Sequence, residues 1–314
     1  MRVRVLGAGV VGLTSALRLA RDGHHVDLVA ARMGDDTTSA VAAALWYPYR
    51  AYPAADVTRW SASSYATLRG LADDPRTGVR MRLGRELFRR PAPEPWWRDA
   101  VPELARATAA RLPTGYADGF ELTVPVADMA VHLPWLLGEV IAAGVAVRSG
   151  RFEKLADALV GVDVVVNCTG LGARELVGDA HLTPVRGQVV VVAQFGLREW
   201  VIDQSDPEQL RYVVPREDTV LLGGTADDGD EDLTVRADTA SGILDRCADL
   251  VPALRDARVL GHRVGLRPGR PSVRLEAEVT DRGPVVHCYG HGGAGVTLSY
   301  GCAEDVAHLV SGLR

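Results

Sequence analysis

The sequence predicts an α/β protein in two parts. One part is a parallel-sheet domain assembled from separate segments of the chain, and the other is an α+β part, built on a mixed or antiparallel sheet, that is inserted into it. Three observations support this prediction. Residues 3–32 read as strand, helix and strand. Residues 284–313 give a strand, a glycine loop and a closing helix. Between them, several β-rich runs are separated by polar turns.

Length and composition set the limits for this prediction. A chain of 314 residues has room for about two ordinary domains. Hydrophobic residues make up 47% and charged residues 24%, which is typical of soluble folded proteins. The net charge of -5 provides no basic surface for nucleic acid or for an anionic membrane, and no apolar run is long enough to span a bilayer. A small-molecule partner is therefore expected.

The four cysteines are far apart in the sequence. Cys168, Cys247, Cys288 and Cys302 form no C-x-x-C pair and no His/Cys group at metal-ligand spacing. We therefore expect buried, reduced thiols in a cytoplasmic protein, and no metal site.

The first strand and helix enclose the motif G-x-G-x-x-G, at Gly7, Gly9 and Gly12. In this context the first glycine permits a tight turn, the second lets a pyrophosphate approach the backbone, and the third lets helix and strand pack closely. The phosphates would lie on the helix N-terminus. The motif predicts a dinucleotide site in a Rossmann-type domain; the alternative is a tight turn that binds no ligand.

The identity of the dinucleotide stays open at this motif. An acidic residue is expected at the end of the second strand, to hold the ribose. Asp27 lies inside the strand, where alternation can point it away, and the strand ends in Ala30, Ala31 and Arg32. Arg32 is compatible with a 2′-phosphate, so NADP, NAD and FAD all remain.

The middle of the chain changes character twice. The stretch from roughly residue 37 to residue 113 is rich in Pro, Arg and Trp and lacks strand-helix alternation, so we expect a separate, inserted part within it. Residues 134–149 then predict a helix and a strand, and the apolar run at 162–173 predicts a strand buried on both faces of a parallel sheet. We expect residues 1–50, 138–185 and 260–314 to form the dinucleotide domain, and residues 51–137 and 186–259 to form the substrate domain.

A second glycine cluster lies near the end of the chain. Gly290, Gly292, Gly293 and Gly295 fall within six residues, between a strand and a helix. Such a segment brings backbone groups close to a ligand, and the following helix N-terminus attracts electron-rich groups. This second glycine loop, with the helix N-terminus that follows it, suits a flavin ring better than a nicotinamide. The alternative is a surface loop.

These motifs together resemble the D-amino-acid oxidase family, which consists of FAD flavoproteins in the wider glutathione-reductase-like Rossmann group. The similarity runs along essentially the whole chain in the same order. The specific motifs are VGLRPGRP and YGHGGAG, and GAGVVGL is shared with many flavoproteins. Further matching segments are TTSAVAAALWYPY, FEKL, VDVVVNCTGLGA, RGQVVVV and RYVVP.

The resemblance implies the roles of three residues at the substrate. Arg267, the arginine of GLRP, would grip the substrate α-carboxylate, for which a planar guanidinium is suited. The Tyr212 hydroxyl would give the same carboxylate another hydrogen bond, and the carbonyl of Gly293 would accept the substrate amine. The implied reaction is hydride transfer from Cα to flavin N5. The products are a 2-oxo acid and ammonia, and dioxygen is reduced to hydrogen peroxide.

The resemblance also implies non-covalent FAD and the residues that hold it. Because Ala31 stands where some members have an acid, the ribose contact is not assigned. The expected FAD residues are Gly7, Ala8, Gly9, Val10, Val11 and Gly12 at the pyrophosphate; Arg32 near the adenosine; Thr37, Thr38, Ser39, Ala43, Ala44 and Leu45 along the diphosphate and flavin; and Gly292, Gly293, Ala294, Gly295, Val296 and Thr297 at the isoalloxazine.

One departure from the family bears on substrate range. Only three residues separate Asp206–Glu208 from Tyr212, whereas mammalian members have a longer lid with another tyrosine. We expect a short or absent lid, an open pocket and a preference for neutral and bulky D-amino acids. The alternative is a short exposed turn without kinetic meaning.

Other functions stay open at this stage. They are an FAD amine oxidase acting on glycine, N-methyl amino acids or D-aspartate, an NAD(P)-dependent dehydrogenase, and a flavoprotein without catalysis. The expected partners are a D-amino acid and dioxygen, without nucleic acid or membrane, and homodimers are common in the family. Of the arginines near Arg267, we expect Arg263 and Arg274 to serve domain pairing and Arg270 to lie on the surface.

Overall fold

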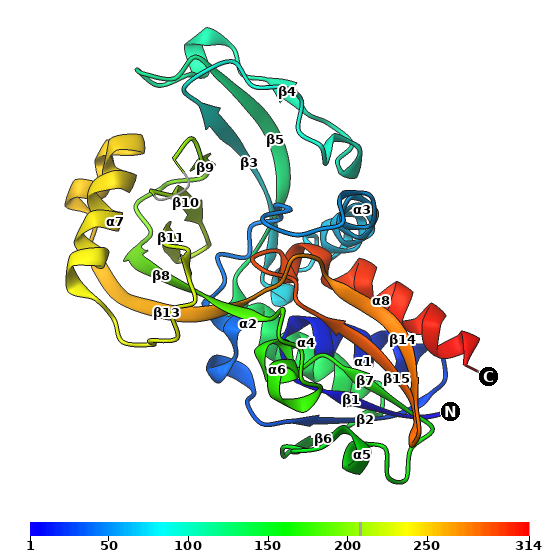
Figure 1. Cartoon of the computed structure of the whole chain (residues 1–314). Coiled ribbons are helices and arrows are strands. Elements are labelled where there is room, and N and C mark those ends of the chain that lie inside the picture. The colour runs from blue at the N-terminus through cyan, green and yellow to red at the C-terminus, as the bar shows by residue number, and fades with distance from the viewer. Residues whose placement is uncertain (207–208, 314) are drawn as a thin grey trace.

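The computed structural model describes residues 1–206 and 209–313. In this part of the chain, the strands form two sheets that lie on opposite sides of the molecule, as Figure 1 shows. No described helix is both long enough and apolar enough to cross a bilayer.

The first sheet is the predicted parallel sheet. The strand order is β14 (Arg274–Thr280), β15 (Gly283–Tyr289), β7 (Val164–Asn167), β1 (Arg2–Leu6), β2 (His25–Ala30), β6 (Ala146–Ser149). The neighbouring strands from β15 to β6 are parallel, and β14 is antiparallel to β15 at the edge. Every residue of β7 is buried, as its apolar sequence predicts.

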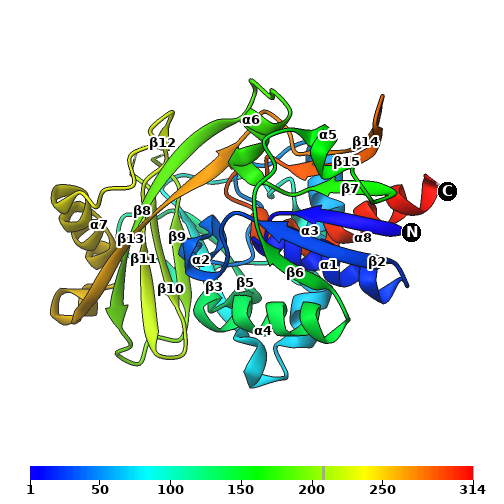
Figure 2. The ribbon, with the colours of Figure 1, turned by 90° about the horizontal axis from the view of Figure 1, so that it is seen from below.

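Helices from both ends of the chain cover this sheet. The helix α1 (Val10–Arg21) packs against α8 (Gly295–Gly312) and α4 (Met129–Ala142), which brings the two glycine motifs into one domain (Figure 2). The sequence predicted a helix from Pro134, but α4 begins five residues earlier, because Asp128 caps the helix by accepting a hydrogen bond from Ala130 N. The short helices are α2 (Thr38–Val41), α5 (Leu155–Ala158) and α6 (Ala173–Leu176).

The second sheet is mixed, because β3 (Val79–Phe88) runs parallel to β9 (Trp200–Asp203) and all its other paired strands are antiparallel. The helix α7 (Ala237–Leu250) covers one face, where Val190, Val213 and Ile243 are buried together. The other face turns toward the first sheet. The strands in order are β12 (Asp227–Asp228), β8 (Thr183–Ala193), β11 (Thr219–Gly223), β10 (Arg211–Pro215), β9 (Trp200–Asp203), β3 (Val79–Phe88), β5 (Asp118–Ala127) and β4 (Ala105–Arg106), and β13 (Val259–Gly269) pairs with β8.

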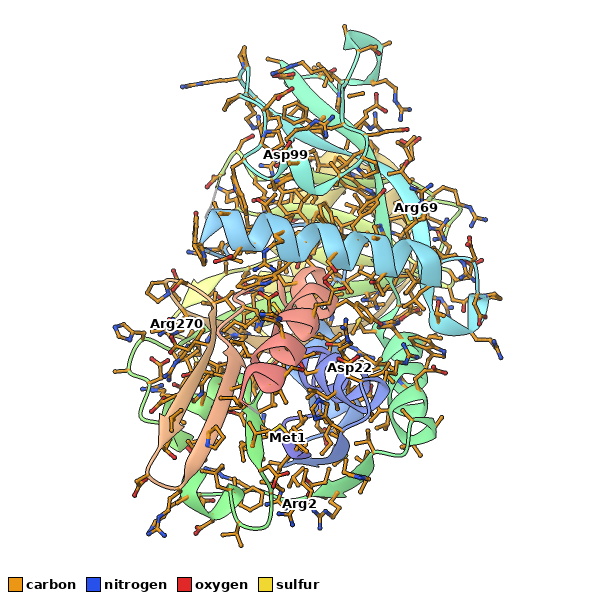
Figure 3. The ribbon with its side chains drawn as sticks, turned by 90° about the vertical axis from the view of Figure 1, so that its right-hand side faces the viewer. Met1, Arg2, Asp22, Arg69, Asp99 and Arg270 are labelled. Carbon is orange, nitrogen blue, oxygen red and sulfur yellow. The ribbon has the colours of Figure 1, made fainter. Side chains whose placement is uncertain are left out.

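Two elements do not follow the expected domain segments. The strand β13 lies in the second sheet, although residue 260 was expected to begin a segment of the dinucleotide domain. The helix α3 (Ala54–Leu71) packs against α8 as well as against β3 and β5, and Figure 3 shows it crossing the middle of the molecule. A β-rich pattern identifies a strand but not the sheet that accepts it, so sequence alone did not place β13.

Candidate active site

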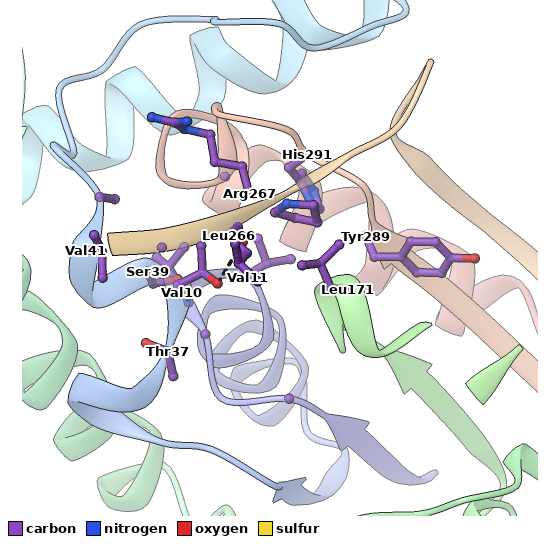
Figure 4. A pocket seen from close by; sticks show the side chains of 18 of the residues that line it. Val10, Val11, Thr37, Ser39, Val41, Leu171, Leu266, Arg267, Tyr289 and His291 are labelled. Atoms are coloured by element: carbon purple, nitrogen blue, oxygen red, sulfur yellow. Dashed lines mark hydrogen bonds between the residues drawn. The ribbon is translucent and has the colours of Figure 1, made fainter. Parts of the chain in front are cut away.

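A cavity of about 990 Å³ runs between the two sheets. This volume is at the upper end of the range of roughly 300–1,000 Å³ for small-molecule sites. The expected FAD residues all line it except Gly12 and Ala294, which lie directly behind its wall, and Tyr212, Arg267 and Gly293 line it as well. Figure 4 shows Arg267 on one side of β13. On the other side lie Val10, at the start of α1, and Ser39, in α2. Nearly all the residues that the sequence predicted to bind FAD or the substrate therefore lie around one cavity.

The first glycine motif forms the tight turn that its spacing predicts. Gly7 has φ of 105°, and a Cβ added to it would lie 2.5 Å from the carbonyl oxygen of Cys168. A Cβ on Gly12 would lie 2.0 Å from the carbonyl oxygen of Gly7. Any side chain at either position would therefore displace the backbone of the turn, which explains the choice of glycine.

The N-terminus of α1 opens into the cavity at this turn. Gly9 is its N-cap residue and supplies no side chain, while Val10 N donates a hydrogen bond of 3.0 Å to Ser39 Oγ. The helix carries no acidic residue in its first turn. The positive end of the helix dipole therefore faces the cavity, and this end fits the pyrophosphate of FAD.

The adenosine end of the cavity differs from the usual motif. Asp27 turns away from the cavity and pairs with Arg4 and Arg148, as its position inside the strand indicated. Arg32 lines the cavity and is exposed, and among the described residues it has no ion-pair partner. Asp35 and Asp36 also line the cavity. The sequence analysis missed these two acids because it expected an acid at the strand end and not in the 3₁₀ turn that follows.

The segment from Thr37 to Leu45 is held in place by its own side chains. Thr37 Oγ1 donates to Gly34 O at 2.8 Å, and Thr38 Oγ1 donates to Leu266 O at 3.0 Å. The second bond ties this segment to β13, next to Arg267. These hydroxyls therefore order the wall of the cavity, and Ala43, Ala44 and Leu45 form the apolar surface that follows.

The second glycine loop approaches the same cavity from the opposite end of the chain. Gly292 has φ of 53°, donates its N–H to Pro268 O at 2.9 Å, and would place a Cβ 2.6 Å from Arg50 O. Residues Gly295 to Thr297 begin α8, and Thr297 Oγ1 donates to Tyr47 O and accepts from Tyr47 N. The loop therefore brings a second helix N-terminus to the cavity, as expected for the flavin ring.

Arg267 reaches the cavity from β13 with little room to move. Its Nη1 donates to Thr225 O at 2.9 Å. A Cβ on Gly187, in the adjacent strand β8, would lie 2.5 Å from both Nη1 and Nη2, so the guanidinium lies on the bare backbone of that glycine. Among the described residues no carboxylate pairs with Arg267. A half-buried cation without a counter-ion, in a cavity, is suited to binding an anion.

Tyr212 lies next to Arg267 and is positioned by another glycine. Its ring covers Gly223, directly opposite on β11, where a Cβ would lie 1.9 Å from Tyr212 Cζ. Burial raises the pKa of Tyr212, although the nearby charge of Arg267 acts in the opposite direction. The hydroxyl therefore keeps its proton near neutral pH and can donate a hydrogen bond.

Tyr49 completes this group of side chains, and the sequence analysis assigned it no role. A Cβ on Gly293 would lie 2.5 Å from Tyr49 Cδ1 and 3.6 Å from Arg267 Cδ, so both side chains lie against the glycine loop. The only signal in the sequence was its place in the segment TTSAVAAALWYPY, which matched the family as a whole.

The prediction that Arg270 lies on the surface is wrong. Its Nε pairs with Asp179 at 3.0 Å, and its Nη1 donates to Ser272 O. The stem of the side chain packs on Gly290, and Asp179 also accepts a hydrogen bond from Tyr289. Arg270 thus supports the second glycine loop, because a buried acid that is distant in sequence pairs with it.

The cysteines are free and buried, as predicted. The fold nevertheless brings together Cys288, His291 and Cys302, with ligand atoms all within 4.8 Å of one another, although they have no metal-ligand spacing in the sequence. Burial lowers the pKa of His291 to about 4, so its ring is neutral. The three residues come from the end of β15, the glycine loop and α8.

Comparisons with known proteins agree with this geometry. The family model described as "FAD dependent oxidoreductase" matches residues 2–309. A D-amino-acid oxidase of Rubrobacter xylanophilus is 50% identical over 98% of this chain and 95% of its own length. A D-amino-acid oxidase of Streptomyces coelicolor is 44% identical over 98% of this chain and 96% of its own length.

A solved structure gives the same fold at lower identity. Glycine oxidase from Geobacillus kaustophilus has a TM-score of 0.82 and 22% identity, and the alignment covers 100% of this chain and 95% of that chain. At this identity the likeness supports the α/β fold with its mixed second sheet. Since the family model covers almost the whole length and the curated relatives agree with it, the fold, the dependence on FAD and the resemblance found in the sequence are confirmed, and the chain belongs to the D-amino-acid oxidase family of FAD-dependent oxidoreductases.

Proposed function

We propose that the protein oxidatively deaminates D-amino acids to 2-oxo acids, ammonia and hydrogen peroxide. One observation supports this proposal most strongly. Arg267 is a cation without a carboxylate partner among the described residues, and it lies beside Tyr212 in the cavity that the two glycine motifs line. This arrangement requires a ligand that carries a carboxylate.

Arg267 and Tyr212 bind the substrate α-carboxylate. The guanidinium is already oriented by Thr225 O and by the surface of Gly187, so it loses little freedom when a carboxylate binds. A planar guanidinium holds a carboxylate through two parallel hydrogen bonds, and the Tyr212 hydroxyl adds a third. Together they fix the orientation of the substrate Cα.

Gly293 accepts the substrate amine with its carbonyl oxygen. With the carboxylate and the amine both fixed, only one enantiomer directs its Cα–H toward the cofactor. The chemistry that FAD supplies when bound is a two-electron oxidation, in which the Cα–H leaves as hydride and dioxygen later takes the electrons. Orientation of this kind contributes roughly 7–11 kcal/mol to lowering a barrier, and little acid-base chemistry is needed.

Neutral side chains suit the rest of the pocket. Leu45, Ile202, Leu210 and Val214 line the cavity near Tyr212 and are all buried. The short lid stays a prediction, because Pro207 and Glu208 lie outside the described residues. Bulky apolar D-amino acids are therefore the preferred substrates.

A peroxide assay tests this function. The purified protein with its bound FAD should form hydrogen peroxide with D-alanine and D-methionine, and should not with L-alanine. Glycine, N-methyl amino acids and D-aspartate in the same panel test the alternative amine oxidases. A protein that binds FAD but forms no peroxide with any D-amino acid would be a non-catalytic flavoprotein, contrary to the proposal.

The partners and the location follow from the same proposal. The partners are a D-amino acid and dioxygen, and the homodimer that is common in the family stays a prediction. Four free cysteines, all buried, are the reason to propose a reducing, cytoplasmic location.

A further inference from the structure

A buried carboxyl group lies on the cavity side of the second sheet, close to Tyr212. Glu86 on β3 is directly beside Ile202 on β9, and Ile202 is directly beside Tyr212 on β10. Residues in register on neighbouring strands share a face, so the three side chains form a row. Glu86 is 4% exposed, and among the described residues no cation pairs with it.

Tyr47 connects this carboxyl group to the cavity. Its hydroxyl donates a hydrogen bond of 2.5 Å to Glu86 Oε1. Tyr47 lines the cavity and Glu86 does not. The tyrosine is fixed at its backbone by two hydrogen bonds to Thr297, and its ring packs edge-on against Trp97. The backbone of Tyr47 is therefore fixed to the start of α8, and the contact with Trp97 and the bond to Glu86 orient its side chain.

The direction of this hydrogen bond determines what the wall presents to a ligand. Because the hydroxyl proton of Tyr47 points to Glu86, and Trp97 and Gln204 interact with the same oxygen, the Tyr47 hydroxyl has no proton left to donate to a ligand in the cavity. Burial raises the pKa of Glu86 to about 7, so the carboxyl is ionised in alkaline solution, directly behind the phenol. Of the lining residues beside Tyr47 and Glu86, Ile202 is apolar and Gln204 is uncharged, so neither neutralises this charge.

We propose that Tyr47 is a specificity-determining residue and that Glu86 is its positioning residue, which together exclude D-amino acids with acidic side chains. This inference rests on the proposed function. A substrate bound by Arg267 through its α-carboxylate extends its side chain along the same wall. A second carboxylate there meets a negative charge and an oxygen that cannot donate, whereas an amide of the same shape meets no such repulsion.

The surroundings of Glu86 contain few other titratable groups. The strand β5 presents Phe120, β9 presents Ile202, and Trp97 and Gln204 lie beside the Tyr47 hydroxyl. Tyr212 is the next titratable group in the row, and Arg267 lies behind it. Arg211 lines the cavity but lies 3.8 Å from Asp203, which is on the opposite face of the sheet from Ile202. A pH dependence of side-chain selection in the neutral range therefore reports on Glu86.

The test compares D-glutamine with D-glutamate, which have the same shape and differ in charge. The ratio of kcat/KM for D-glutamine to kcat/KM for D-glutamate cancels effects on the α-carboxylate, the amine and the cofactor. In the wild-type holoenzyme this ratio should rise through neutral pH as Glu86 ionises. In the Glu86→Gln variant it should be flat, and at about pH 8.5 it should be lower than in the wild type by about tenfold.

A matched control comes from a similar pair on the opposite face of the same sheet. Tyr116 donates a hydrogen bond of 2.6 Å to Asp203, which is buried and does not line the cavity. In Asp203→Asn the ratio should still rise through neutral pH as in the wild type, because the nearby Arg211 can add only an offset that does not depend on pH in this range. Equal ratios in the wild type and Glu86→Gln, or the same change in Asp203→Asn, would overturn the inference.

The wild-type profile needs no variant, so the test does not depend on how Glu86→Gln folds. A wild-type ratio that stays constant between about pH 6 and pH 8.5 would also contradict the inference. Failure of the proposed function looks different: the wild type would then oxidise neither D-glutamine nor D-norvaline at any pH.

Discussion

Bare backbone positions the two side chains that we propose to bind the substrate carboxylate. The Arg267 guanidinium lies on Gly187, and the Tyr212 ring lies on Gly223. In each pair, a glycine in the neighbouring strand leaves the space that the functional side chain fills. The orientation of the proposed anion site therefore depends on two glycines that have no side chain of their own.

Replacing Arg267 tests the anion site directly. Arg267→Ala should raise KM for D-alanine by about 30-fold or more, because removing one partner of a buried charge pair costs roughly 2–5 kcal/mol. The FAD content, measured by visible absorbance, should stay normal, since Arg267 contacts the substrate. Steady-state kinetics with an unchanged KM would show that Arg267 does not hold the carboxylate.

Replacing Gly187 tests the support of that arginine. A Cβ at this position would lie 2.5 Å from both terminal nitrogens of Arg267, so Gly187→Ala should displace the guanidinium and lower kcat/KM by at least about tenfold, with FAD retained. Gly261 on β13 is the matched control, because nothing lies within 4 Å of its added Cβ. Gly261→Ala should have nearly normal kinetics, and equal losses in both variants would argue against the contact.

The buried Glu86 should reduce stability in alkaline solution. Its pKa is raised from 4.5 to about 7, so the folded state holds the proton more tightly than the unfolded state. The stability that this proton provides is present below about pH 4.5 and is lost as pH rises to about 7, a change of roughly 3 kcal/mol. Urea unfolding should therefore show that Glu86→Gln gains stability relative to the wild type across this interval, with a constant difference above it. A difference that is independent of pH would contradict the raised pKa.

At the scale of elements, two helix N-termini from opposite ends of the chain meet at one cavity. The helix α1 follows the first glycine turn, and α8 follows the second glycine loop and packs against α1. The close packing of α1 on the turn depends on Gly12, where a Cβ would lie 2.0 Å from the carbonyl oxygen of Gly7.

Replacing Gly12 should separate cofactor binding from folding. Gly12→Ala should weaken FAD binding by at least about tenfold in a titration of the apoprotein, because it displaces the turn that faces the pyrophosphate. Gly138→Ala in α4 is the control, since its added Cβ meets nothing within 4 Å and alanine favours a helix. It should bind FAD normally and be slightly more stable. Normal FAD affinity in Gly12→Ala would refute this role.

Sequence patterns predicted the elements that depend on local information. The glycine turn at Gly7 and the buried strand β7 follow from spacing and apolar character, and both are present. Contacts between distant segments could not be predicted in the same way. The ion pair of Arg270 with Asp179 and the place of β13 in the second sheet depend on which segments meet in space. The assignment of Arg267 came from a family motif, whereas the role of Gly187 needed coordinates.

At the scale of the whole molecule, the site lies between two sheets that have different tasks. The glycine motifs follow strands β1 and β15 of the first sheet, and Arg267 and Tyr212 lie on strands β13 and β10 of the second. The cavity brings the proposed carboxylate site of one sheet next to the glycine motifs that are expected to hold the cofactor on the other. A reaction between substrate and cofactor therefore requires both sheets in their observed arrangement.

The most direct test of this account is the visible absorbance of the bound FAD when an amino acid is added without oxygen. We predict that D-alanine bleaches the absorbance of the oxidised flavin, that L-alanine leaves it unchanged, and that admitting air restores it. If D-alanine left the flavin oxidised, or if both enantiomers bleached it equally, the protein would not be an oxidase that selects D-amino acids through Arg267, Tyr212 and Gly293.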